Sequence, residues 1–494
     1  MTKTCSELLS GQNASFTGNA QRAVSGLASS SNKVNPGDAF FCIVGLVSDG
    51  HAFAQDAVDR GASLVVAQRE LQLENAEDVT VAVVEDTRVA AAAAAAVFYD
   101  HPSASFKLVG ITGTNGKTTT TFLVDHLVQS AGGLCGIIGT TGNRVGMSFE
   151  HADHTTPDSM DLQHLFARMR EAQCTAVAME VSSHALDLKR TWGTTFAVTA
   201  FTNLTQDHLD YHKTFEAYYQ AKAKLFGPDY PARRVVCIDD EWGTRLAGEC
   251  AGRGDEVITT GFAEQADIHP VSVEYFDDRT QVQLSVQGAI LSFAYPLVGR
   301  FNVSNMMTAF GIGLSLGLQP WAIAEALASA PGVPGRLERI SDDSVPGVSV
   351  FVDYAHTPDA VEKVIASVRA LNPARLLVVF GCGGDRDARK RPLMGRAALA
   401  GDFAIVTSDN PRTEDPDAII ADILTGMEGA QGSYVVEPDR AKAIHQAIDL
   451  AQPGDAILVA GKGHEDYQIL GTETIHFDDR EVVREALARK GSAQ

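Results

Sequence analysis

One stretch sets the architecture of this chain: Phe106-Lys-Leu-Val-Gly-Ile-Thr-Gly-Thr-Asn-Gly-Lys-Thr-Thr-Thr-Thr-Phe122. Its apolar run, Leu108 to Ile111, predicts a buried strand, and the apolar spacing from Phe122 onward predicts a helix. A glycine-rich turn ending in Lys117-Thr118 lies between them. Such a turn lets backbone N–H groups surround an anion at the positive end of a helix. The stretch therefore predicts a phosphate cradle, in which Lys117 reaches the outer phosphates and Thr118 holds Mg²⁺.

The cradle has the short form Gly113-Thr-Asn-Gly-Lys-Thr118, since Ile111 stands where the longer P-loop pattern has a glycine. The alternative is an ordinary glycine turn before a helix. The order of strand, turn, Lys-Thr pair and helix favours the cradle.

Composition limits the class of protein. A length of 494 residues suggests about three domains. Acidic residues outnumber basic ones by 62 to 40, and the net charge of −22 disfavours a nucleic-acid partner or an acidic membrane surface. We find no apolar signal core at the N-terminus and no apolar stretch of membrane-spanning length. Seven scattered cysteines without a CxxC pair suit reduced thiols in a cytoplasm.

Strand and helix patterns alternate along most of the chain and predict an α/β fold with three domains. Residues 1–104 form a small α/β domain, with strands over 39–44 and 62–67 and helices over 51–60 and 89–99. Residues 105–335 form a central P-loop ATPase-like domain around a mostly parallel sheet, with an antiparallel hairpin region over 268–294. Residues 336–494 form a doubly wound, Rossmann-like domain.

Polar residues follow several predicted strands. Glu180 and the stretch 203–212 follow strands next to the cradle, so we expect them at the same sheet edge. Three polar loops, 381–386, 409–412 and 461–465, follow strands of the last domain and should share one edge as a binding crevice.

Single residues leave alternatives open. Glu180 suits a hard cation such as Mg²⁺, but a strand-end carboxylate also occurs on ordinary surfaces. His208 alone favours a structural role, and Lys222 reads by composition as a surface helix lysine. Arg386 and Arg412, with Glu465, provide groups that bind a carboxylate and an ammonium; a solvated charged loop is the alternative.

Six motifs occur in the order of one known family. They are Gly113-Thr-Asn-Gly-Lys-Thr-Thr, Met179-Glu-Val-Ser-Ser-His-Ala-Leu186, Asn203-Leu-Thr-Gln-Asp-His-Leu-Asp-Tyr-His212, Gly299-Arg-Phe-Asn-Val-Ser-Asn305, Asp353-Tyr-Ala-His-Thr-Pro358 and Gly461-Lys-Gly-His-Glu-Asp466. Together they resemble the Mur ligases of peptidoglycan synthesis, over essentially the whole chain.

The resemblance implies an ATP-dependent amide ligase. In this family ATP phosphorylates the free carboxylate of a UDP-linked peptide, and an amine attacks the acyl phosphate. The implied substrates here are UDP-N-acetylmuramoyl-L-alanyl-D-glutamate and meso-diaminopimelate, with Mg²⁺ as cofactor. The implied enzyme is a cytoplasmic monomer that binds no nucleic acid and does not insert into a membrane.

The resemblance also assigns site residues. Matches to the ATP-binding positions are Gly113, Thr114, Asn115, Gly116, Lys117, Thr118, Thr119, Asn302, Arg336, Asp353 and His356. Matches to the UDP-peptide site are Ser29, Ser31, Thr155, Thr156, Ser182 and Arg190. Thr118, Glu180, His208 and a carbamylated Lys222 match the metal cluster, and the implied catalytic residues are Lys117, Lys222 and His208.

The loop Asp409-Asn-Pro-Arg412 matches the form found in members that add diaminopimelate instead of lysine. Diaminopimelate carries a second carboxylate that lysine lacks, and a guanidinium left unpaired by lysine would penalise that substrate. Matches to the amino-acid site are Arg386, Asp409, Asn410, Pro411, Arg412, Gly461 and Glu465.

Two other functions are consistent with parts of the sequence. One is a different ligase of the superfamily, such as a lysine-adding form or a folylpolyglutamate synthase. The other is a P-loop switch or regulatory ATPase without a ligase step, although such a protein would not need two further domains with separate ligand edges. ATP turnover that requires both the UDP-dipeptide and the amino acid would separate these from the ligase.

Overall fold

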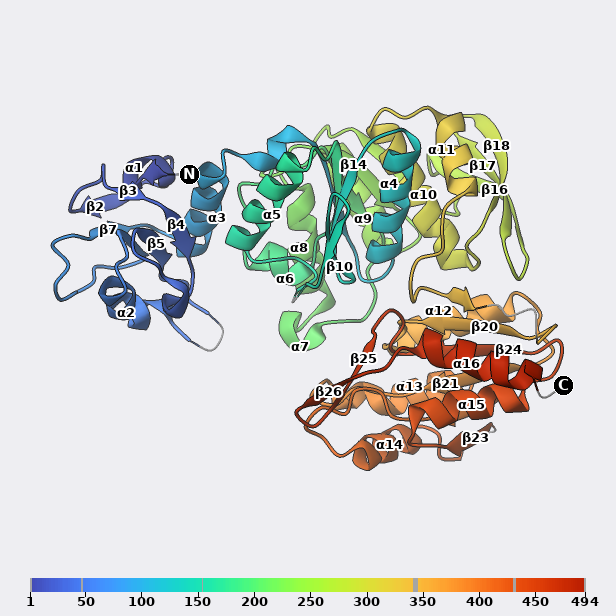
Figure 1. Ribbon diagram of the computed structural model, residues 1–494. Coiled ribbons are helices and arrows are strands. Elements are labelled where there is room, and N and C mark those ends of the chain that lie inside the picture. The colour runs from blue at the N-terminus through green and yellow to red at the C-terminus, as the bar shows by residue number, and fades with distance from the viewer. Residues whose placement is uncertain (1, 46–47, 153, 341–344, 430–431, 493–494) are drawn as a thin grey trace.

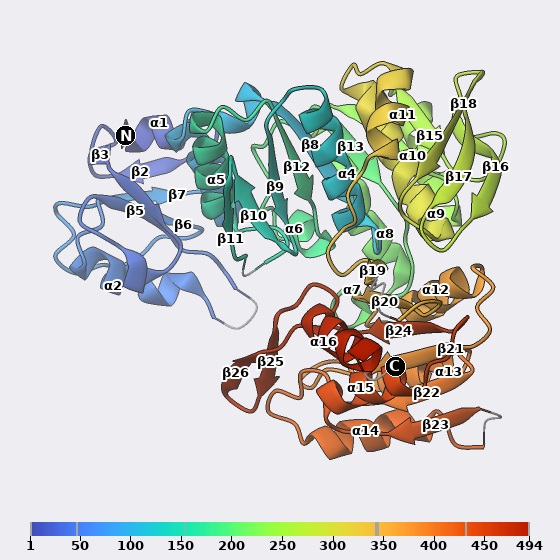
Figure 2. The same cartoon turned by 45° about the vertical axis from the view of Figure 1, so that its right-hand side comes forward.

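Three β-sheets organise the computed structural model, which describes residues 2–45, 48–152, 154–340, 345–429 and 432–492. In these residues the sheets follow one another along the chain, and Figure 1 shows them in three bodies, coloured blue, green to yellow, and orange to red. Figure 2 shows the same three bodies from another side. None of the described helices is both long enough and apolar enough to span a membrane.

The first sheet has the strand order β2-β7-β6-β5-β4. Its strands are β2 (Ser15–Thr17), β4 (Gly26–Ala28), β5 (Asp38–Phe41), β6 (Leu64–Ala67) and β7 (Thr80–Val83). Near it lie β1 (Lys3–Thr4), α1 (Cys5–Leu8), β3 (Ala23–Val24), the 3-10 turns η1 (Ser31–Lys33) and η2 (Gly50–Phe53), α2 (Ala54–Asp59) and α3 (Thr87–Phe98). The helix expected over 51–60 is wrong in its first part, because the Asp49 side chain caps η2 and α2 begins only at Ala54.

The central sheet has the order β11-β10-β9-β12-β8-β13-β14-β15-β16-β17-β18 in the described chain. Its strands are β8 (Lys107–Thr112), β9 (Cys135–Gly139), β10 (Gly142–Val145), β11 (Ser148–Glu150), β12 (Ala176–Glu180), β13 (Val198–Phe201), β14 (Arg233–Cys237), β15 (Val257–Thr260), β16 (Ile268–Tyr275), β17 (Thr280–Val286) and β18 (Ala289–Tyr295). Strand β8 pairs in parallel with β12 on one side and β13 on the other. The cradle therefore follows a strand in the middle of the sheet.

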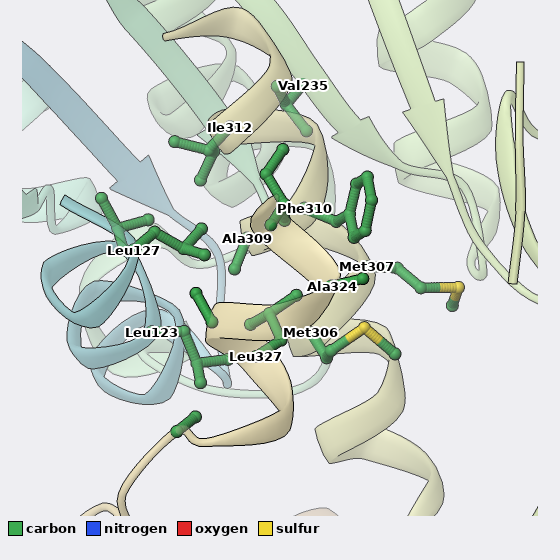
Figure 3. Close-up of a cluster of buried hydrophobic side chains, with 14 of the residues drawn as sticks. Leu123, Leu127, Val235, Met306, Met307, Ala309, Phe310, Ile312, Ala324 and Leu327 are labelled. Atoms are coloured by element: carbon green, nitrogen blue, oxygen red, sulfur yellow. The ribbon is translucent and has the colours of Figure 1, made fainter. Parts of the chain in front are cut away.

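Helices cover both faces of this sheet. They are α4 (Lys117–Ser130), α5 (Ser159–Glu171), α6 (Ser183–Asp187), α7 (Leu209–His212), α8 (Phe215–Ala223), α9 (Glu241–Gly252), α10 (Arg300–Ser315) and α11 (Pro320–Ala328), with 3-10 turns η3 (Pro102–Ser105) and η4 (Lys224–Phe226). In Figure 3, Leu127 of α4 points toward Ala309 and Ile312 of α10, whereas the ring of Phe310 points away from α4, and all four belong to one buried cluster. This packing fixes the helix that begins at the cradle against the sheet.

The third sheet has the order β19-β20-β24-β21-β22-β23. Its strands are β19 (Glu338–Ile340), β20 (Ser349–Asp353), β21 (Leu376–Phe380), β22 (Phe403–Val406), β23 (Ser433–Val436) and β24 (Ala456–Ala460). The helices are α12 (Pro358–Arg369), α13 (Arg391–Ala398), α14 (Pro416–Thr425), α15 (Arg440–Leu450) and α16 (Asp479–Ser492), with the 3-10 turn η5 (Ala388–Lys390) and a hairpin of β25 (Tyr467–Leu470) and β26 (Glu473–His476). The run from β20 to β23 is parallel, and β19 is antiparallel to it.

These sheets confirm the predicted α/β fold class, with a mostly parallel central sheet and a doubly wound C-terminal sheet. The strands expected over 376–380 and 456–460 match β21 and β24 residue for residue, because both are continuous apolar runs buried on both faces. The hairpin region expected over 268–294 is the three-stranded antiparallel meander β16-β17-β18.

Candidate active site

The phosphate cradle joins the end of β8 to the start of α4. Its backbone is held by the loop after the neighbouring strand β13: Thr114 N donates to Asn203 O at 2.8 Å, and Asn115 N donates to Asn203 Oδ1 at 2.9 Å. Thr202 Oγ1 donates in turn to Asn115 O at 2.6 Å. The 203–212 stretch thus lies at the cradle's edge, as the strand order in the sequence predicted.

Two glycines are required by this geometry. Gly113 has a φ of +149°, and a Cβ there would lie 1.9 Å from Thr202 Oγ1. Gly116 has a φ of +87°, and a Cβ there would lie 2.2 Å from Asn305 Oδ1 of α10. Any side chain at these positions would push the loop away from Thr202 and Asn305, so glycine keeps the backbone of the cradle close to both residues.

Two lysine side chains donate to the backbone of the cradle. Lys117 Nζ donates to Gly113 O at 3.0 Å and to Thr114 O at 2.8 Å. Lys222, on α8, is buried and donates from Nζ to Gly113 O at 2.7 Å. Burial lowers the pKa of both amines, and the charge of Lys117 lowers that of Lys222 further. Lys222 is therefore not the exposed helix lysine that its local sequence suggested.

Oxygen donors converge beside the cradle. Thr118 Oγ1 lies 2.9 Å from Glu180 Oε1, at the end of β12. Thr140 donates to the same carboxylate from its backbone N at 3.0 Å and from Oγ1 at 3.1 Å. A hydroxyl beside a carboxylate suits Mg²⁺, which takes one or two protein carboxylates and completes its shell with phosphates and water. The described residues contain no group of three or more His, Cys, Asp or Glu arranged to hold a metal.

His208 lies at the start of α7 with a φ of +53°. Its Nε2 is 3.4 Å from Asp207 Oδ2, and its ring packs against His184 at a centroid distance of 4.9 Å. Burial lowers the pKa of His208 to about 4, although the Asp207 carboxylate opposes the shift. The imidazole is therefore neutral at pH 7, as metal coordination would require.

The residues expected at ATP come from both sides of the predicted domain boundary at 335/336. Arg336 donates from Nη2 to Thr118 Oγ1 at 3.2 Å and lies 4.5 Å above the ring of Tyr354. Asp353 accepts from the backbone of Leu337 at 2.6 Å, and burial raises its pKa to about 6. Arg336 thus reaches the cradle from the segment that precedes β19.

His356 and Asn302, also expected at ATP, differ in their exposure to solvent. His356 is exposed, and its Nδ1 lies 2.9 Å from Tyr354 O. Asn302 is fully buried and donates from Nδ2 to Val298 O at 2.8 Å. Asn302 therefore supports the start of α10 from inside the protein. Thr119, the last cradle residue expected at ATP, is also buried.

Four of the six residues expected at the UDP-peptide form one cluster next to Glu180. Thr156 Oγ1 donates to Glu180 O at 2.9 Å, and Ser182 N donates to Thr156 Oγ1 at 3.0 Å. Arg190 Nη1 donates to Thr156 O at 2.9 Å, and Thr155 Oγ1 lies 3.1 Å from Thr140 Oγ1.

The remaining two, Ser29 and Ser31, belong to the N-terminal part of the chain, after strand β4. Ser29 is exposed and Ser31 is buried at the start of η1.

The three polar loops of the last sheet meet at one edge, as predicted. Asn410 Nδ2 donates to Glu465 Oε2 at 2.9 Å, which joins the loops after β22 and β24. Arg412 Nη1 donates to Gly384 O at 2.7 Å, which joins the loops after β22 and β21. Burial and the neighbouring Asp409 raise the pKa of Glu465. Arg386, on the first of these loops, is exposed.

Lys462 also belongs to this edge, although its role was not predicted from the sequence. This lysine is fully buried, and its Nζ donates to Tyr467 O at 2.5 Å, to Asn410 Oδ1 at 3.3 Å and to Glu465 Oε2 at 3.4 Å. Lys462 therefore links the Asn410 amide and the Glu465 carboxylate, which lie on two different loops. Its position inside the Gly461-Lys-Gly-His-Glu motif is the feature of the sequence that could have identified it as a site residue. Thr140, at the end of β9, was also missed, although the strand-end rule applies to it.

Three family models match successive parts of this chain. Residues 23–105 match a model described as "Mur ligase family, catalytic domain". Residues 111–313 match the Mur ligase middle domain, and residues 335–463 match the "Mur ligase, glutamate ligase domain".

Curated relatives match nearly end to end. The chain is 47% identical over 477 residues to the UDP-N-acetylmuramoyl-L-alanyl-D-glutamate–2,6-diaminopimelate ligase of Gloeobacter violaceus, covering 95% of both chains. It is 41% identical over 475 residues to the protein of the same name from Clostridium botulinum, covering 96% of this chain and 97% of that one.

Solved structures share the fold. A structure of UDP-N-acetylmuramoyl-L-alanyl-D-glutamate–2,6-diaminopimelate ligase superposes with a TM-score of 0.72 at 32% identity, covering 99% of both chains. The MurF ligase of Thermotoga maritima in complex with ADP superposes with a TM-score of 0.61 at 18% identity, covering 94% of this chain and 98% of that one.

Proposed function

This chain belongs to the Mur ligase family, and we propose that it joins meso-diaminopimelate to UDP-N-acetylmuramoyl-L-alanyl-D-glutamate at the expense of ATP, in peptidoglycan synthesis. The main support is the loop edge formed by Asn410, Arg412 and Glu465. Relatives that match this chain over nearly its full length are named as that ligase. A guanidinium, an amide and a carboxylate at one edge suit an amino acid with a charged group at each end.

The reaction has two steps. An oxygen of the free peptide carboxylate forms a bond to the γ-phosphorus of ATP, and ADP leaves as the β–γ bridging bond breaks. The amine of diaminopimelate then attacks the acyl carbon. The C–N bond forms, the C–O bond to phosphate breaks with its electron pair, and the ammonium protons pass to solvent. The protein's part is positioning and charge neutralisation.

Residues of the cradle carry the first step. The cradle's backbone N–H groups and Lys117 neutralise phosphate charge, and Arg336 reaches the same place from the C-terminal domain. Thr118 and Glu180 would hold Mg²⁺, with His208 serving a second ion; when bound, these ions neutralise charge on the transferred phosphoryl group. Thr155, Thr156, Ser182 and Arg190, beside Glu180, would bind the peptide whose carboxylate is phosphorylated.

Lys222 has a chemical role that its burial supports. Its neutral amine can form a bond to the carbon of CO₂ and release a proton, which gives a carbamate anion. An anion at this position would offset the positive charge of Lys117 and of the metal cluster.

An amino-acid panel tests the function. The purified chain, ATP, Mg²⁺ and the UDP-dipeptide are combined with diaminopimelate or lysine, and both phosphate release and the mass of the product are measured. We expect phosphate release to require both substrates, with diaminopimelate preferred to lysine by roughly 100-fold or more, because lysine leaves buried polar groups unpaired. Equal use of lysine, or phosphate release without any amino acid, would contradict the proposal.

Further expectations follow from the same proposal. We expect the ligase to act as a monomer in the cytoplasm, and the domain boundaries to lie near residues 104/105 and 335/336. Sedimentation at assay concentrations tests the first, and limited proteolysis tests the second.

A further inference from the structure

His464 has no part in the reaction described above, yet it belongs to the loop 461–465 and packs against Tyr354, which contacts Arg336 beside the phosphate cradle. It directly precedes Glu465, and its ring packs on that of Tyr354 at a centroid distance of 5.0 Å. Its Nδ1 is buried and has no hydrogen-bond partner among the described residues. A buried, unpaired ring nitrogen beside a ligand loop calls for an explanation.

Contacts run from His464 to the cradle along the C-terminal domain. The ring of Tyr354, next to His464, lies under the guanidinium of Arg336 at 4.5 Å. Arg336 Nη2 then donates to Thr118 Oγ1 at 3.2 Å. This path crosses into the central domain at Thr118.

A second path returns to His464 through the central domain. Thr118 Oγ1 lies 2.9 Å from Glu180 Oε1, and the same carboxylate accepts from Thr140 N at 3.0 Å. The backbone of Thr140 lies near the His464 imidazole and favours its protonated form. The two paths close a circuit of six residues: His464, Tyr354, Arg336, Thr118, Glu180 and Thr140.

The circuit crosses the domain boundary twice, at Arg336–Thr118 and at His464–Thr140. It can close only when the loop that carries Glu465 lies against the cradle. We propose that His464 is a positioning residue that aligns the loop 461–465 with the phosphate site, so that the bound amine meets the acyl phosphate. This inference rests on the proposed function.

The residue type suits this place. Burial and the charges of Arg336 and Arg480 lower the pKa of His464 to about 3, so the ring is neutral at pH 7. A neutral ring can lie near two guanidinium groups without repulsion, whereas the charged side chain of lysine or arginine cannot. Its ring also packs against that of Tyr354 at a tilt of 47°, and it carries two nitrogens that can take part in polar contacts.

Two variants separate the ring from its nitrogens. His464→Phe keeps a ring against Tyr354 and removes both nitrogens, whereas His464→Gln keeps a side-chain donor and removes the ring. We expect His464→Phe to lower kcat about 10- to 100-fold, the scale of a small misplacement of reacting groups, with KM for diaminopimelate and ATP changed less than about threefold. His464→Gln should recover part of the loss. In His464→Phe the ratio of phosphate released to amide formed should rise above the wild-type ratio. An acyl phosphate that is not attacked promptly by the amine is hydrolysed by water, and this releases phosphate without forming an amide.

His445→Phe is the matched control. His445, on α15, also has a buried Nδ1 without a partner among the described residues. This variant should keep kcat and coupling within about twofold of the wild type, since most substitutions away from a site have small effects. Thermal unfolding of each variant shows whether a loss of kcat reflects loss of fold.

Three results would overturn the inference: unchanged kcat and coupling in folded His464→Phe, a rise in KM for diaminopimelate at unchanged kcat, or an equal loss in the His445 control. Failure of the proposed function looks different, since the wild-type chain itself would then release phosphate without diaminopimelate.

Discussion

Lys117 and Lys222 donate to the same acceptor, the carbonyl oxygen of Gly113, at 3.0 and 2.7 Å. Burial lowers the pKa of Lys222 far below its ordinary value, and Lys117 adds to the shift. The neutral form of Lys222 is therefore favoured, and that is the form which reacts with CO₂.

Lys222→Ala should lower ligase activity about 100-fold or more, the scale of losing a group that stabilises charge in the transition state. Formate or acetate should restore part of it, because a small carboxylate can occupy the place of the carbamate. Steady-state rates with and without the acids measure this. Lys224→Ala is the control, since Lys224 is half exposed and pairs with Asp187. Activity like that of the wild type in Lys222→Ala would disprove the role.

Arg412→Ala should raise KM for diaminopimelate about 10- to 100-fold and leave KM for ATP within about twofold, because a charged hydrogen bond to the substrate is lost. Arg389→Ala serves as control, since Arg389 lies on η5 with a side chain 79% exposed. Steady-state kinetics with each substrate varied in turn give both constants. Equal losses for the two substrates would argue against a role in choosing the amino acid.

Arg440→Ala should destabilise the C-terminal domain by about 3–5 kcal/mol, because it leaves the Asp479 carboxylate buried without a partner. Both side chains are fully buried, and Arg440 also donates to Ala460 O at 3.0 Å, at the end of β24. Native-state hydrogen exchange of β24 measures the change. The exposed pair Arg489–Asp449 is the control, and Arg489→Ala should leave exchange nearly unchanged. Unchanged exchange in Arg440→Ala would contradict the expected cost.

His212→Asn should make the chain less sensitive to acid. His212 is buried and its Nε2 lies 2.9 Å from Ser183 Oγ; burial, followed by the charge of His184, lowers its pKa from 6.5 to about 4. Between these values the unfolded chain binds a proton that the folded chain does not. The contribution of His212 to stability is therefore complete above pH 6.5 and is lost as the pH falls towards 4.

Thermal midpoints between pH 7 and 4 measure this dependence. Their decline with falling pH should be shallower in His212→Asn than in the wild type. His476 gives a control of opposite sign, because its hydrogen bond to Glu481 raises its pKa, so its contribution is lost as the pH rises. Parallel curves for His212→Asn and the wild type would refute the assignment.

Local sequence determined the fold class, the family, the position of the cradle and the sheet edges on which polar loops meet. Apolar runs such as those of β21 and β24 and the turn before Lys117 are short-range patterns, and the common direction of parallel strands places their ends together. The ligand roles of the site residues and the domain boundaries stay predictions.

Only the tertiary structure decided which side chains meet. Lys222 contacts Gly113 across 109 residues, and Arg336 contacts Thr118 across 218. Lys462 and His464 have no periodicity that marks them, because a buried charge or ring is explained by partners from other strands and not by its neighbours in sequence. Sequence periodicity indicates which face of a helix or strand is buried. It does not indicate which residue packs against that face, and the shift in pKa that this residue causes arises only when the domains have packed.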